Sequence, residues 1–149
     1  MRRKSRESEF LDLIDYWLDY FNIDNVIVQR DNRGPGLASI EDDDLNDEFI
    51  FRYSWKQLRY CRNHTRLSAV LHEIGHIIQK LPYRTETQKI QSEYHAERFA
   101  LDVMKEKHPV HYRNECKRMQ KSMSSEKYRK HLDRVHLLAF QQIEEYNAK

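Results

Sequence analysis

The sequence HEIGH at residues 72–76 places two histidines one helical turn apart, with a glutamate directly after the first. Side chains four residues apart lie on one face of a helix, so both imidazoles can bind one tetrahedral ion at about 2.0 to 2.1 Å. Glu73 points in another direction and would flank the ion. Its carboxylate could there accept a proton from a metal-bound water, whose pKa falls to about 7. His72 and His76 are therefore predicted metal ligands, and Glu73 a catalytic base.

The helix expected around this motif carries an apolar stripe on the side away from both histidines. Its members are Leu67, Val70, Leu71, Ile74, Ile77, Ile78 and Leu81. Because the stripe faces the core, core packing does not account for the histidines on the opposite side. Gly75 disfavours the helix by up to about 1 kcal/mol, and we expect backbone of a sheet to pass close to it.

A catalytic zinc site needs a third protein ligand, with the fourth position left for water. Residues 91–104, QSEYHAERFALDVM, predict a second helix in which Glu93 and Glu97 fall within an apolar arc. Burying a carboxylate costs several kcal/mol unless a cation or hydrogen bonds compensate. We therefore expect Glu93 to bind the ion, and Glu97 to hold the second ring nitrogen of a ligand, that of His72. The rival ligand, His95, projects to the polar side of this helix.

A catalytic zinc site at which a tetrahedral oxyanion forms also benefits from a hydrogen-bond donor that stabilises this oxyanion. Tyr83, His111 and His136 could each reach the site from a neighbouring element. The sequence does not distinguish among these three residues.

The rest of the sequence predicts an α+β fold that is mostly helical, with a small, largely antiparallel sheet of three strands. Apolar periodicity, turn residues and prolines indicate the elements. Helices are expected over 8–21, 63–80, 86–107, 110–123 and 125–147, and strands over 25–30, 37–41 and 47–53. A length of 149 residues favours one domain, 1–149. Within it we expect residues 1–7 to be flexible and 110–149 to form C-terminal helices.

The stretch NHTRLSAVLHEIGH, followed by an ExxAxxFA pattern at Glu93, Ala96, Phe99 and Ala100, resembles the ImmA/IrrE metallopeptidases. The resemblance covers about residues 20–105. It implies a zincin-like fold in which a downstream glutamate completes the Zn²⁺ site of the HExxH helix. It also implies a zinc-dependent endopeptidase that cleaves a specific repressor or transcriptional regulator, often in phages, mobile elements or stress responses.

Two other functions remain open from the sequence. One is a binding module without catalysis, in which the metal is structural and the C-terminal helices bind a partner. The other is a DNA-associated protease of the SprT-like kind, which uses HExxH with a third histidine. Glu73 favours catalysis, because a structural site has no use for a carboxylate beside an open coordination position.

The charge distribution bears on the partners. Net charge is only +2, but residues 104–134 contain ten Lys or Arg against four Asp or Glu. This excess predicts an acidic partner or nucleic acid along 104–134. No apolar run approaches the roughly 20 residues of a membrane helix, and no apolar stretch follows the basic start. We therefore expect a cytoplasmic protein without a membrane partner.

Overall fold

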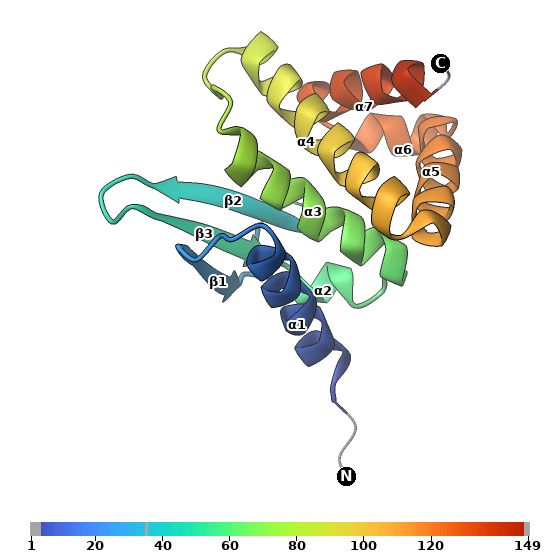
Figure 1. Ribbon diagram of the computed structural model, residues 1–149. Coiled ribbons are helices and arrows are strands. Elements are labelled where there is room, and N and C mark those ends of the chain that lie inside the picture. Colours follow the sequence, from blue (N-terminus) through green and yellow to red (C-terminus); the bar gives the residue numbers. More distant parts are fainter. Residues whose placement is uncertain (1–3, 35, 148–149) are drawn as a thin grey trace.

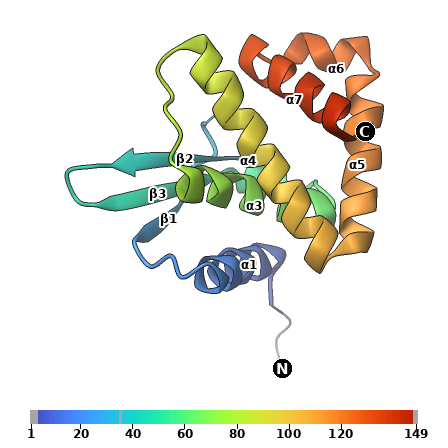
Figure 2. The ribbon, with the colours of Figure 1, turned by 45° about the horizontal axis from the view of Figure 1, so that its top comes forward.

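The computed structural model describes residues 4–34 and 36–147, and it is mostly helical with one small sheet (Figure 1). The elements, in chain order, are α1 (Arg6–Tyr20), β1 (Val26–Arg30), β2 (Ala38–Asp43), β3 (Glu48–Tyr53), α2 (Trp55–Leu58), α3 (Asn63–Gln79), α4 (Glu86–Lys107), α5 (Pro109–Met123), α6 (Glu126–His131) and α7 (Arg134–Asn147). Helices α3 and α4 pack along each other, between α1 on one side and α5, α6 and α7 on the other (Figure 2). No helix among the described residues is long and apolar enough to cross a bilayer.

The sheet is mixed, which corrects the largely antiparallel arrangement predicted from the sequence. Its strand order is β1-β3-β2, and β1 pairs with β3 in parallel, whereas β2 pairs with β3 antiparallel. Strand β3 takes the centre because its alternate residues Phe49, Phe51 and Tyr53 are buried. The acid-rich strand β2, ASIEDD, takes an edge, where charged side chains remain solvated. The prediction is correct for β2 and β3 and wrong for β1, which pairs with β3 and not with β2, its neighbour in sequence.

Helix α1 covers one side of the core that it forms with α3 and the sheet. Ser5 caps the helix, because its hydroxyl accepts the N–H of Ser8 at 3.1 Å. Phe10, Ile14 and Trp17 from α1 are at most 2% exposed, in one cluster with residues of β3, α3 and α4. Arg6 and Glu7, which were expected in a flexible segment, form the first turn of α1. Residues 1–3 lie outside the described residues.

Helices α3 and α4 approach closely at Gly75. A Cβ atom on this glycine would lie 3.0 Å from Cδ1 of Phe99 and 3.2 Å from Cα of Ala96. The backbone that passes Gly75 therefore belongs to α4, not to the sheet as predicted. All members of the apolar stripe from Leu67 to Ile77 are buried, whereas Ile78 and Leu81 are 43% and 38% exposed. The close approach brings the histidines of α3 opposite the glutamates of α4.

The C-terminal part differs from the single helix predicted over 125–147. The chain there forms α6 and α7, which are separated by Leu132 and Asp133. The Asp133 carboxylate starts the second helix, since it accepts the backbone N–H of His136 at 2.9 Å. The short helix α2 was not predicted either, whereas α5 begins at Pro109, close to the predicted start.

Candidate metal centre

Three side chains from α3 and α4 form a group that could hold a metal ion. One potential ligand atom from each of His72, His76 and Glu93 lies within 4.8 Å of the other two. The Nε2 atoms of the two histidines are 3.2 Å apart. Nε2 of His72 is 2.8 Å from Oε2 of Glu93, and Nε2 of His76 is 3.3 Å from Oε1 of the same carboxylate. The predicted ligands thus converge, two from one turn of α3 and one from the facing turn of α4.

These distances fit a bound ion. A tetrahedral site with ligands at 2.0 to 2.1 Å has ligand atoms about 3.3 Å from one another. The separations of 2.8, 3.2 and 3.3 Å in this group are near that value. A cation between these groups would meet two imidazole nitrogens and one negatively charged carboxylate. The donor set of two imidazoles and one carboxylate therefore suits a divalent cation.

The second nitrogen of each histidine is held by a residue of α4. Nδ1 of His72 lies 2.7 Å from Oε2 of Glu97, the contact that was predicted. Nδ1 of His76 lies 3.1 Å from Oγ of Ser92, which the sequence did not predict. An N–H donated from Nδ1 leaves Nε2 of each ring free to bind an ion. Ser92 could have been found, because residues 92, 93, 96 and 97 share one face of α4.

Burial and hydrogen bonding act against each other at this group. Burial lowers the pKa of His72, but hydrogen bonds with Glu93 and Glu97 outweigh burial and raise that pKa well above its usual value. For Glu93, burial raises the pKa, yet hydrogen bonds from His136, His72 and His76 hold it far below the ordinary range. Both shifts mean that the centre favours positive charge beside an ionised Glu93.

Glu73 is buried next to the group, with 8% of the residue exposed. It shares one groove with His72, His76 and Glu93. Burial raises the pKa of the Glu73 carboxyl to about 6, although His72 and His76 oppose this shift. Glu73 is thus mostly ionised at neutral pH but more basic than an ordinary carboxylate, which suits a proton acceptor.

Two of the three proposed oxyanion donors lie at the group. The Tyr83 hydroxyl, from the segment between α3 and α4, donates to Oε1 of Glu93 at 2.8 Å. Nε2 of His136, from α7, is 3.4 Å from Oε2 of Glu93, and Nδ1 of this ring is 2.9 Å from Asp133. Burial and the Glu93 carboxylate raise the pKa of Tyr83 above its usual range, so the hydroxyl stays protonated. The hydrogen bond with Glu93 raises the pKa of His136 to about 9, despite burial.

The other two histidines considered from the sequence lie elsewhere. His111 does not line the groove, and its ring packs 5.8 Å from that of His108. Residue His95 contacts α3 through its backbone carbonyl, which accepts from Gln79 Nε2 at 3.3 Å. His95 does not belong to the candidate group found among the described residues.

The groove that contains the group has a volume of about 800 Å³. Leu37 and residues of β2, among them Ala38 and Ile40, line the groove together with residues of α3 and α4. The C-terminal part of the chain also lines it, with Met119, Met123, Leu132, His136 and Phe140. The groove is large enough for several residues of an extended peptide.

No protein-family model, curated protein or solved structure matches this chain. Residue chemistry and geometry at this centre are therefore the basis for a functional proposal.

Proposed function

We propose that this protein is a zinc-dependent endopeptidase with a zincin-like fold, of the ImmA/IrrE type, that hydrolyses a specific regulatory protein. The observation that carries the proposal is the convergence of His72, His76 and Glu93 beside a buried Glu73 in one groove. A purely structural metal site would not need the buried, proton-accepting carboxylate of Glu73.

The side chains at the centre divide the work of peptide hydrolysis. A bound zinc ion would supply Lewis-acid polarisation and lower the pKa of a water molecule. Glu73 accepts the proton of the attacking water and passes it to the leaving amine. The hydroxyl of Tyr83 and the ring N–H of His136 can donate to the oxyanion that develops on the substrate carbonyl. Glu97 and Ser92 orient the two imidazoles.

Strand β2 suits the binding of an extended peptide. It is an edge strand of the sheet, and its residues line the groove opposite the C-terminal helices. An edge strand offers unpaired backbone N–H and C=O groups along one side, to which a peptide can add as a further strand. A peptide bound in this way would pass over the residues of the centre, because β2 and α3 line the same groove.

The SprT-like alternative retains a candidate for its third histidine. His95 does not fill that role, but His136 lies 3.4 Å from Glu93. Zinc content separates the two proposals. Glu93→Ala should lose the metal if the site is of the ImmA/IrrE type, whereas His136→Ala should lose it if the third ligand is a histidine.

The peptidase proposal is tested with zinc-loaded protein and a library of quenched fluorescent peptides. Glu73→Gln keeps the size of the side chain but removes the proton acceptor, so cleavage should fall by two or more orders of magnitude. Zinc content and melting temperature should stay those of the parent. Glu86→Gln is the matched control, because it makes the same change at an exposed carboxylate of α4, outside the metal group. Undiminished cleavage by Glu73→Gln would show that this residue is not the base, and a loss of zinc would show that it is a ligand.

A further inference from the structure

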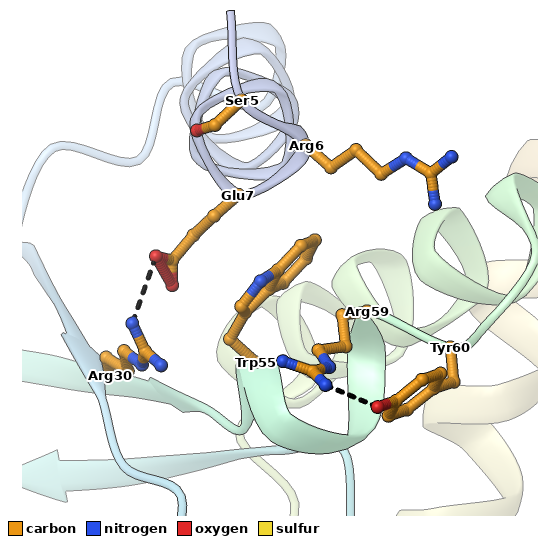
Figure 3. Close-up of a pocket in the computed structure, with 7 residues that line it drawn as sticks. All are labelled: Ser5, Arg6, Glu7, Arg30, Trp55, Arg59 and Tyr60. Carbon is orange, nitrogen blue, oxygen red and sulfur yellow. Dashed lines mark hydrogen bonds and ion pairs between the residues drawn. The ribbon is translucent and has the colours of Figure 1, made fainter.

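A second cavity, of about 480 Å³, lies between the first turn of α1 and helix α2 (Figure 3). It shares no lining residue with the groove of the metal centre. Three arginines from separate elements line it: Arg6 from α1, Arg30 from the end of β1 and Arg59 from the C-terminal end of α2. Residues 24 or more positions apart in sequence thus bring three guanidinium groups to one cavity.

The positive charge in this cavity is only partly balanced. Glu7 is the carboxylate that lines it, and its Oε1 atom is 3.2 Å from Nη1 of Arg30. Oε2 of Glu7 accepts from the Tyr53 hydroxyl at 3.4 Å. Within residues 4–34 and 36–147, no ion pair with a carboxylate is found for Arg6 or Arg59. Arg59 donates from Nη2 to the Tyr60 hydroxyl, which is a neutral partner, so its charge and that of Arg6 can still attract an anion (Figure 3).

Arg66 adds a fourth positive charge beside the cavity, although it does not line it. Its guanidinium is buried, with 9% of the residue exposed, and lies 5.2 Å from the ring of Trp55, which lines the cavity. It donates to the carbonyl oxygens of Leu58 and Arg59 at 2.9 and 3.0 Å. In the described part of the chain no carboxylate pairs with it. Nη1 of Arg66 also lies 3.4 Å from Oδ1 of Asn63, so neutral oxygens hold this guanidinium, and its charge adds to the positive potential beside the cavity.

Aromatic rings beside the arginines indicate which anion fits. Trp55 is partly exposed, and Tyr60 is 76% exposed with the Arg59 guanidinium 4.6 Å from its ring centre. Guanidinium groups bind phosphates through paired hydrogen bonds, and exposed rings stack on unpaired bases. No aliphatic side chain lines the cavity. Aromatic rings beside guanidinium groups are the combination on which single-stranded nucleic acids bind, with bases on the rings and phosphates on the arginines.

We propose that this cavity binds single-stranded nucleic acid, with phosphates on Arg6, Arg30 and Arg59 and a base against Trp55 or Tyr60. A nucleic acid bound in this way lies at the α1–α2 end of the molecule, at a site separate from residues 104–134. This inference does not depend on the peptidase activity.

The test uses the full, zinc-loaded chain and fluorescein-labelled 15-mers of deoxythymidine and of uridine, followed by fluorescence anisotropy. Arg6→Gln with Arg59→Gln should weaken binding at least tenfold. The control pair, Arg113→Gln with Lys117→Gln, removes the same charge from exposed positions of α5 and should change affinity less than twofold. For three phosphate contacts, log affinity should fall with log salt at a slope of about 2. Zinc content and peptide cleavage should not change in either pair.

A second variant tests the role of the rings. Tyr60→Ala should weaken binding about fivefold or more, because it removes a stacking surface without changing charge. The proposal is supported if the parent binds either 15-mer and the variants weaken that binding as stated. The 15-mer that binds more tightly shows whether DNA or RNA is preferred. The proposal is overturned if the parent binds neither 15-mer, if the α5 pair loses affinity equally, or if a poly-glutamate peptide competes as well as unlabelled nucleic acid.

Discussion

At the scale of single residues, the group of His72, His76 and Glu93 could be predicted because a buried carboxylate is costly unless a cation or hydrogen bonds compensate it. Glu93 and Glu97 were assigned from their position in an apolar arc, and both contact His72 in the structure. Tyr83 and His136 could not be separated from His111 by sequence. Their positions depend on a segment that joins α3 and α4 and on the Asp133 cap of α7, and neither has a periodic pattern.

The two histidines of that set give a matched pair for mutation. His136→Ala should lower peptide cleavage by two to three orders of magnitude, since it removes an oxyanion donor, while zinc content stays near that of the parent. His111→Ala should leave cleavage unchanged, because that side chain does not line the groove. Single-turnover cleavage rates at matched zinc occupancy provide the comparison. Equal rates for the two variants would exclude His136 from the reaction.

At the scale of elements, local sequence signals were sufficient to predict most helices, but they did not predict which strands pair. Helix α4 was predicted with both ends correct, because Thr85 forms a capping box with Gln88 and Pro109 follows its end. The parallel pairing of β1 with β3 was missed because register and neighbour choice depend on which strand the core buries. The break between α6 and α7 depends on one aspartate cap within an otherwise helical pattern.

Helices α3 and α5 are tied together by Glu115, which is fully buried. Its carboxylate lies 2.6 Å from His64 Nδ1, accepts from the Thr65 hydroxyl at 3.0 Å and binds Nε of Arg118 at 2.8 Å. The contact with α3 was not predicted, because His64 and Thr65 are 51 and 50 positions from Glu115 in the sequence. Burial raises the pKa of Glu115, but Arg118, His64 and Thr65 outweigh burial and lower it.

Glu115→Gln should therefore lower the free energy of unfolding at pH 7 by about 2 to 3 kcal/mol. Because the folded-state pKa lies below the ordinary value of 4.5, the carboxylate stabilises the fold fully above about pH 4.5. That contribution is lost as pH falls through the folded-state pKa, so the difference between parent and variant should narrow in acid. Urea unfolding of both proteins from pH 7 to pH 3 measures this difference in the free energy of unfolding. Glu126→Gln, on an exposed pair with Lys130, is the control and should change stability by less than about 0.5 kcal/mol. A difference that widens in acid would contradict the assigned shift.

At the scale of the whole molecule, the arrangement separates two chemically different regions. The groove between β2 and the C-terminal helices contains the cluster of histidines and glutamates, and the cavity between α1 and α2 contains arginines. If both proposals hold, this separation would let the molecule bind a nucleic acid at one end while it cleaves a peptide in the groove. Net charge alone gave no indication of this, because the three arginines of the cavity are 24 or more positions apart in the sequence.

The zinc content of the purified protein tests the central claim most directly. His72 and His76 from α3 and Glu93 from α4 should retain about one zinc ion per chain through purification without chelators. Elemental analysis should find this stoichiometry in the parent and in Glu73→Gln. Glu93→Ala should hold much less zinc and should melt at a lower temperature, because the ion links two helices. A parent protein that contains no zinc, even after incubation with added zinc and removal of the excess, would contradict the account.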